Sequence, residues 1–163
     1  MKALKLFVAV VSVAMVGAVS YAAGASKSVS KAASELKWEP MAPNVPIQVA
    51  TLWGDRTKGE SGVLLKFPGG FDSGMHAHTA DYHAVLIQGT WMHTEEGAKE
   101  TKELSPGSYV MQAGKVMHND TCKAGSECII FVHQHAKADF IPGKAAPAPT
   151  PAPAPTPAPK GTK

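Results

Sequence analysis

The central part of this sequence lacks a surplus of positive charge. The chain has 16 Lys and Arg against 13 Asp and Glu, but five of the basic residues lie outside residues 23–142, whereas all the acidic residues lie inside that range. The net charge of the central part is therefore −2, and its cations are not clustered. Because a nucleic-acid surface needs clustered cations, the composition argues against a nucleic-acid partner.

Cysteine is also scarce. Cys122 and Cys128 are the only two in the chain, and they flank the turn-like segment Lys123-Ala124-Gly125-Ser126. In an oxidising compartment such a pair across a tight hairpin is expected to form a disulfide. A cysteine metal site is less favoured, because five residues separate the two thiols rather than the usual two to four.

Long apolar runs are absent except at the N-terminus, where Leu6 to Val19 follow a short basic start. Ser20 and Ala22 fit the −3 and −1 positions of a signal-peptidase site. We therefore expect residues 1–22 to be a signal peptide and the protein to be exported, to the periplasm or the extracellular space. The run is shorter than the roughly 20 residues of a spanning helix, and no cysteine follows it to anchor a lipoprotein.

Composition divides the rest of the chain into three parts. Residues 23–37 are small and polar, which predicts a flexible lead-in. Residues 143–163 form a Pro/Ala-rich tract that cannot build a core and is expected to be a disordered, extended spacer. The folded domain is therefore predicted to span residues 38–142.

Helical periodicity and internal repeats are both missing from the predicted domain. Short apolar or β-branched runs at 45–52, 62–67, 83–88, 108–112 and 128–133 are instead separated by turns rich in Gly and Pro. This pattern predicts an all-β sandwich or barrel.

All seven histidines lie in this domain. His76, His78 and His83 fall within eight residues, and His118 follows a later strand and glycine turn. Since alternate residues of a strand face the same side, His76 and His78 are expected to aim two imidazoles into one space. A metal ion could be chelated there by nitrogens about 2.0–2.2 Å away.

These segments resemble the two motifs of the cupin superfamily. Gly70, His76, His78 and Gly89 match the first motif, G-x5-H-x-H-x3/4-E-x6-G. Gly107, Gly114 and His118 resemble the second motif more loosely, because Gln112 replaces its proline and one extra residue precedes His118. The resemblance implies a cupin β-barrel, a jelly roll, over residues 38–142.

The glutamate ligand of the first motif is missing. Counting forward from His78 places His83 at its position, whereas counting back from Gly89 places Tyr82 there. Strand register favours Tyr82 facing inward, but histidine is the better ligand for a borderline divalent ion. We therefore expect His76, His78 and His118 to bind the metal, with a slight preference for His83 as the fourth ligand. Tyr82, if it faces inward without ligating, is the candidate catalytic hydrogen-bond donor.

Three histidines with an open position suit a catalytic metal. Iron(II) is favoured, while zinc, manganese and nickel are also compatible. Cupins that resemble this sequence include oxygenases with such an iron, but also isomerases, decarboxylases and ligand-binding proteins, so the resemblance fixes no reaction. The histidine triad without the usual carboxylate favours an exported dioxygenase that acts on a small organic molecule. The alternative is a non-enzymatic metal or ligand receptor, tethered in the cell envelope through the Pro/Ala tract. Cupins are frequently dimers through their edge strands, so a homodimer is also an expectation.

The remaining histidines carry weaker predictions. His93 lies in a charged stretch and is expected to be exposed. His133 and His135 lie two apart on the last apolar strand and so on one face. They either line the pocket near the metal or lie at the barrel rim in solvent. Trp53 and Trp91 are expected in the core.

Overall fold

The computed structural model describes residues 27–143. The predicted signal peptide lies outside these residues, as does all of the predicted tail except Gly143. Within the predicted lead-in, the described residues form only a short 3-10 helix, η1 (Ala33–Glu35). No helix in residues 27–143 is long and apolar enough to cross a membrane.

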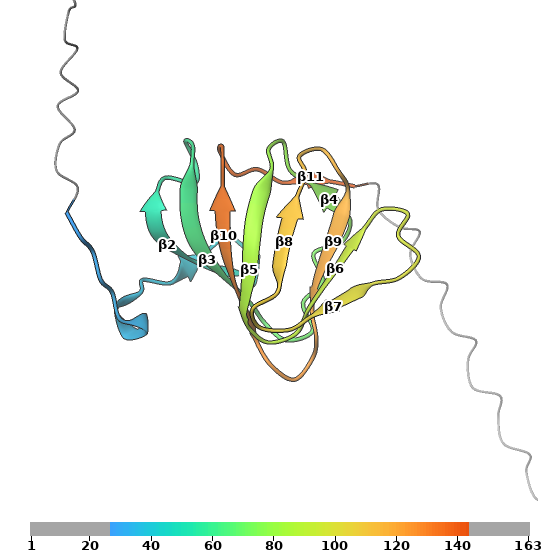
Figure 1. Ribbon diagram of the computed structural model, residues 1–163, viewed down its shortest axis with the longest axis horizontal. Coiled ribbons are helices and arrows are strands. Elements are labelled where there is room, and N and C mark those ends of the chain that lie inside the picture. The colour runs from blue at the N-terminus through green and yellow to red at the C-terminus, as the bar shows by residue number, and fades with distance from the viewer. Residues whose placement is uncertain (1–26, 144–163) are drawn as a thin grey trace, which may run out of the picture. The chain divides into compact units, whose positions relative to one another are not determined.

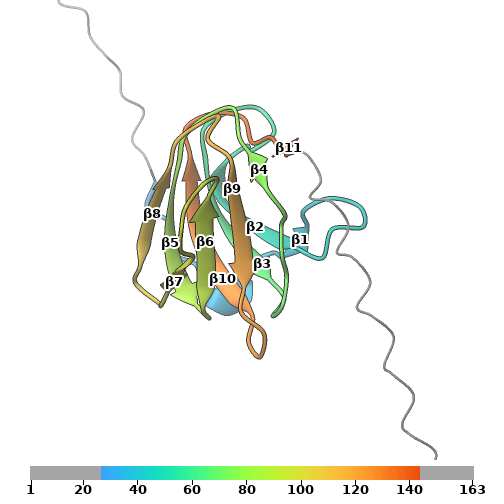
Figure 2. The ribbon, with the colours of Figure 1, turned by 90° about the vertical axis from the view of Figure 1, so that its right-hand side faces the viewer.

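Two antiparallel sheets make up the domain (Figures 1 and 2). The first has six strands, in the spatial order β1 (Glu39–Pro40), β2 (Gln48–Gly54), β3 (Ser61–Phe67), β10 (Cys128–Gln134), β5 (Tyr82–Gln88) and β8 (Tyr109–Gln112). The second has five, in the order β11 (Ile141–Pro142), β4 (His76–Ala77), β9 (His118–Cys122), β6 (Trp91–Glu95) and β7 (Lys102–Leu104). The prediction of an all-β cupin-like jelly roll is confirmed.

Strict alternation along three strands decides which side chains enter the interior. In β5, Ala84 and Leu86 are fully buried, while Val85 between them is less covered. In β10, Ile130 and Val132 face inward, and β9 repeats the pattern with its first, third and fifth residues. This is the expected consequence of a period of two on a sheet with one buried face.

The core is built from the inward-facing apolar residues of both sheets, including Val63, Leu86, Trp91, Leu104 and Ile130. Trp91 is buried, as expected. Trp53 is not a core residue, because its indole lies across Gly62 on the outside of the first sheet and is 48% exposed.

The predicted disulfide is confirmed. Cys122 ends β9 and Cys128 begins β10, and the two sulfurs are bonded with their Cα atoms 5.8 Å apart. The bond closes the connection between the second sheet and the first, at the end of the domain away from β4 (Figure 1).

The five strands expected from the sequence correspond to β2, β3, β5, β8 and β10. The other strands were not predicted individually. Most are short, and β9 combines polar residues with a histidine and an aspartate, so it lacks the apolar run that marks a strand in sequence.

Candidate metal centre

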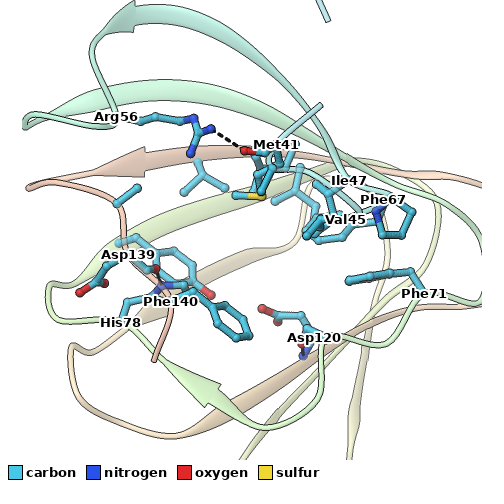
Figure 3. Close-up of a pocket in the computed structure, with 18 of the residues that line it drawn as sticks. Met41, Val45, Ile47, Arg56, Phe67, Phe71, His78, Asp120, Asp139 and Phe140 are labelled. Carbon is cyan, nitrogen blue, oxygen red and sulfur yellow. Dashed lines mark hydrogen bonds between the residues drawn. The ribbon is translucent and has the colours of Figure 1, made fainter. Parts of the chain in front are cut away.

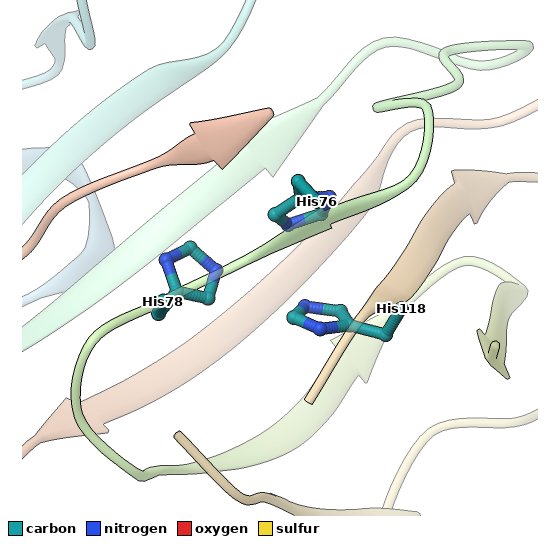
Figure 4. Close-up of side chains that lie close together, drawn as sticks. All are labelled: His76, His78 and His118. Atoms are coloured by element: carbon teal, nitrogen blue, oxygen red, sulfur yellow. The ribbon is translucent and has the colours of Figure 1, made fainter. Parts of the chain in front are cut away.

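His76, His78 and His118 converge at one place in the second sheet (Figure 4). His76 lies on β4 directly opposite His118 on β9, and His78 follows two residues after His76. One nitrogen of each ring lies within 4.8 Å of a nitrogen of the others. The sequence prediction that these three residues come together is met by the structure.

Each imidazole is oriented by a backbone carbonyl. The Nδ1 atoms of His76, His78 and His118 lie 2.9, 2.5 and 3.1 Å from the carbonyl oxygens of Gly74, Asp139 and Val116. A carbonyl oxygen can only accept, so each Nδ1 carries the proton and donates. The Nε2 of each ring is therefore unprotonated and can bind a metal ion.

Burial keeps two of these rings neutral. His76 is 3% exposed and His118 is fully buried. Burial lowers the pKa of His76, and it lowers the pKa of His118 to about 4, because a charged imidazolium is costly away from water. Neutral imidazole is the form that ligates a metal, so little proton release is needed at neutral pH.

A carboxylate that sequence analysis did not identify reaches the same space. Asp120 lies two residues after His118 on β9, on the same buried face. Its Oδ2 is 3.6 Å from Nε2 of His118 and 3.8 Å from Nε2 of His76. Two ligands about 2.1 Å from one ion lie at most about 4.2 Å apart, so these distances fit a shared ion. The set of ligand atoms that all lie within 4.8 Å of one another comprises the three histidines without Asp120, so the carboxylate approaches two of the three rings.

The other oxygen of Asp120 is held by a second set of groups. Trp91 Nε1 donates to Oδ1 at 3.0 Å, and His93 Nδ1 donates to it at 2.7 Å. Nε2 of His93 lies 3.0 Å from Oε1 of Gln112, whose amide nitrogen donates to the carbonyls of Ala113 and Val116. Both ring nitrogens of His93 thus face oxygen atoms of neighbouring side chains.

One expectation is corrected by this network. His93 is not exposed, since its side chain retains only 11% of its accessible surface. Gln112, which replaces a proline of the second cupin motif, is 1% exposed and fixes His93 in place. The alternation from His118 to Asp120 was the one sequence signal for the carboxylate. His93 required the pairing of β6 with β9, and Gln112 required the packing of one sheet on the other.

The ambiguity between Tyr82 and His83 is resolved by the alternation of β5. Tyr82 is 5% exposed, and its hydroxyl lies 3.3 Å from Nε2 of His118. His83 points to the other side of the sheet, where its Nδ1 lies 2.5 Å from the hydroxyl of Tyr109. The preference for His83 as fourth ligand is therefore wrong, because a one-residue step along a strand moves a side chain to the opposite face.

The loops that precede and follow the histidines are tied together. The amide of Lys115 donates to the carbonyl of His78, and the amide of Gly114 donates to Asp81 Oδ1, both at 2.7 Å. A Cβ at Gly114 would lie 2.6 Å from the carbonyl oxygen of Thr79. Glycine is thus required where the two motif segments pass each other.

A cavity of about 600 Å³ opens beside the three histidines (Figure 3). His78, Tyr82 and Asp120 form part of its wall, and most of the remainder is apolar, including Ile47, Leu65, Phe67, Phe71, Ile130 and Val132. Phe140 also lines it and stacks on the His76 ring, with centroids 4.5 Å apart and planes 17° apart. The volume and lining are typical of a small-molecule site.

One cation lines this cavity. Arg56 is the single arginine of the chain, and it is half-buried in the cavity wall, where its guanidinium donates to the carbonyl of Met41 at 2.8 Å. Among residues 27–143, no carboxylate lies within salt-bridge distance of it. Figure 3 shows Arg56 and Asp120 on different walls of the cavity.

Comparison with known proteins identifies the family. A family model described as a domain of unknown function (DUF4437) matches residues 29–148. No curated protein matches the chain.

Among solved structures, KdgF from Halomonas sp. is 23% identical, with 64% of this chain and 92% of that chain covered and a TM-score of 0.52. An RmlC-like cupin protein from Ralstonia eutropha JMP134 is 22% identical, covering 74% and 76%, with a TM-score of 0.59. The polyketide cyclase RemF from Streptomyces resistomycificus is 14% identical, covering 75% and 88%, with a TM-score of 0.61. At these identities the likeness shows the cupin fold alone.

Proposed function

Since the chain belongs to the family described as a domain of unknown function (DUF4437) and has a cupin fold, we propose that it is a metal-dependent enzyme acting on a small organic molecule. We further propose iron(II) as the metal and dioxygen as the co-substrate. The observation that carries this proposal is the meeting of three imidazoles, one of which, His78, lines an apolar cavity. A structural metal site, by contrast, is usually closed and has no substrate cavity beside it.

His76, His78 and His118 would hold the ion, and the Asp120 carboxylate, which approaches two of these rings, would be the candidate fourth ligand. A divalent ion bound there supplies Lewis acidity, and iron(II) adds reactivity toward dioxygen. The backbone carbonyls behind the three rings fix their orientation. Trp91 and His93 fix that of the carboxylate. Such supporting contacts determine the affinity and reactivity of a metal site.

Tyr82 is placed to act on the substrate. Its hydroxyl lies 3.3 Å from His118 Nε2 at the cavity wall. Burial raises its pKa well above the usual 10, so the hydroxyl keeps its proton at neutral pH and can donate a hydrogen bond to a substrate oxygen. Tyr82 is thus proposed as the donor that orients the substrate next to the metal.

The cavity also suggests a substrate class. Its apolar walls favour a hydrophobic body, and Arg56, without a carboxylate partner among the described residues, suits an anionic group at the far end of the ligand. We therefore propose a small organic acid or enolate with an apolar body.

The test begins with anaerobic loading of the untagged protein with one equivalent of iron(II). Wild type is expected to retain one iron per chain through gel filtration, and His76→Ala to lose it. Ile87→Ala is the control and is expected to retain iron, because Ile87 is exposed, does not line the cavity and belongs to neither group of histidines. Oxygen uptake is then measured with diketones, phenolics, thiols and their carboxylate derivatives.

The outcomes separate two functions. Oxygen uptake that requires both iron and His76 would support an oxygenase. Retained iron and saturable ligand binding without turnover of any candidate would instead identify a receptor module. Loss of iron from neither variant, or from both, would overturn the proposed centre.

We also propose that the protein is exported. The disulfide between Cys122 and Cys128 supports an oxidising compartment. Mass spectrometry of the protein recovered from its native cells is expected to find a mature N-terminus at Ala23. An N-terminus that retains residues 1–22 would contradict export by cleavage.

A further inference from the structure

The histidines outside the metal centre form a second group on the outer face of the first sheet. His133 and His135 come from β10 and the residue after its end, Glu60 from the residue before β3, and His83 from β5. We call Glu60, His133 and His135 the outer cluster. His83 lies beside it.

Strand pairing brings these residues together. β10 lies between β3 and β5. His133 is the register partner of Gly62 on one side and of His83 on the other. Gln134 pairs with Ser61, so His135 and Glu60 occupy the next row. Three neighbouring strands thus direct these side chains to one face.

The distances are those of a chelating site. One ligand atom from each member of the outer cluster lies within 4.8 Å of the others. Nε2 of His133 is 2.8 Å from Oε1 of Glu60. The ring centroids of His133 and His135 are 4.6 Å apart, and the ring of His83 is 4.9 Å from that of His135.

Aromatic neighbours hold two of the rings in position. The indole of Trp53 lies 6.0 Å from the ring of His133, in the space left by the missing side chain of Gly62. Tyr109 stacks on His83 with centroids 5.9 Å apart and planes 20° apart, and its hydroxyl contacts His83 Nδ1. These contacts lower the entropic cost of ordering the rings around an ion.

We propose that the outer cluster is a second metal site, which takes zinc(II) or copper(II). Two imidazoles and one carboxylate are a donor set typical of zinc, and the order of affinities for such nitrogen-rich sites rises to copper(II). Glu60 and His135 are exposed, so water fills the open positions, and His83 is the nearest further imidazole.

This site is separate from the cavity. Val132, which precedes His133 on β10, faces the core, as does Ile130. The first sheet therefore lies between the two groups of histidines. Loss of one site is therefore expected to leave the other intact, which makes the second proposal testable independently of the first.

In the experiment, untagged, metal-free protein is titrated with zinc(II) and binding is monitored by calorimetry. The zinc that remains bound after dialysis is then quantified by elemental analysis. Three proteins are compared: wild type, an inner variant with His76→Ala and His118→Ala, and an outer variant with His133→Ala and His135→Ala. We expect two zinc ions per wild-type chain and one per chain in each variant. His83→Ala is expected to weaken the outer site by about tenfold or more, the scale of losing a supporting partner.

Copper(II) provides a spectroscopic check that needs no activity. In the inner variant, the electron paramagnetic resonance spectrum should show nitrogen hyperfine coupling, which should vanish when His133 and His135 are also replaced. Equal zinc stoichiometry in wild type and the outer variant would overturn the second site. If the inner variant binds no zinc while the outer variant still binds it, the result would support only the cavity centre. Circular dichroism of each variant establishes that it is folded.

Discussion

Acid destabilisation of the metal-free protein is a direct consequence of the burial of His118. Its pKa in the folded state is about 4, whereas an unfolded histidine titrates near 6.5. As the pH falls below 6.5, His118 binds a proton in the unfolded chain but not in the folded chain. The free energy of unfolding is therefore fully retained above pH 6.5 and lost progressively as the pH falls toward 4.

The size of the loss follows from the difference in pKa. One pKa unit corresponds to about 1.4 kcal/mol, so His118 alone removes about 3 kcal/mol over the whole interval and about 2.5 kcal/mol by roughly pH 4.5. Because domains are stable by only about 5–15 kcal/mol, this is a large share. His76, whose pKa is also lowered by burial, adds to the loss in the same direction.

The assay is urea unfolding of the metal-free protein between about pH 7 and pH 4.5, for wild type and His118→Asn. Asparagine keeps a donor for the Val116 carbonyl but does not titrate, so the variant should show a pH dependence smaller by about 2.5 kcal/mol. The lower pH limit of this assay avoids most of the titration of Asp55 and Asp139, because hydrogen bonds lower the pKa of each carboxyl. Equal slopes in the two proteins would refute the reasoning.

Three further predictions concern the core, the disulfide and the cavity. Leu86→Ala removes a fully buried side chain and should cost about 2–5 kcal/mol in urea unfolding; an effect below 1 kcal/mol would mean that the core collapses around the gap. Replacing both Cys122 and Cys128 by serine opens a loop with a sequence separation of 6 and should cost about 2 kcal/mol, with unchanged iron retention. Arg56→Ala should weaken binding of a carboxylate ligand about 10- to 100-fold, the scale of a charge-assisted hydrogen bond. The neutral ester of the same ligand should bind both proteins equally; a parallel loss would exclude a charge-specific role.

The sequence predicted the features that depend on local pattern. Turn residues and short apolar runs indicated an all-β domain, and the spacing of His76, His78 and His118 indicated which imidazoles meet. The single disulfide followed from there being two cysteines across a turn. Each of these predictions needed only spacing within one segment or the order of two motifs.

The features that the sequence did not predict depend on which strands pair. Asp120 meets His93 because β6 and β9 are neighbours in one particular register, and nothing in the two segments alone specifies that pairing. The error at His83 has a related cause: the motif spacing allowed either of two adjacent residues, and only the burial of Ala84 and Leu86 fixes the phase of β5.

The last described strand has a mechanical consequence for the metal centre. β11 pairs with β4, the carbonyl of Asp139 holds His78, and the amide of Gly143 donates to the carbonyl of Met75 at 2.8 Å. The chain therefore leaves the domain along the same strand that presents two of the three imidazoles. Displacement of β11 would therefore disturb β4 and with it the positions of His76 and His78.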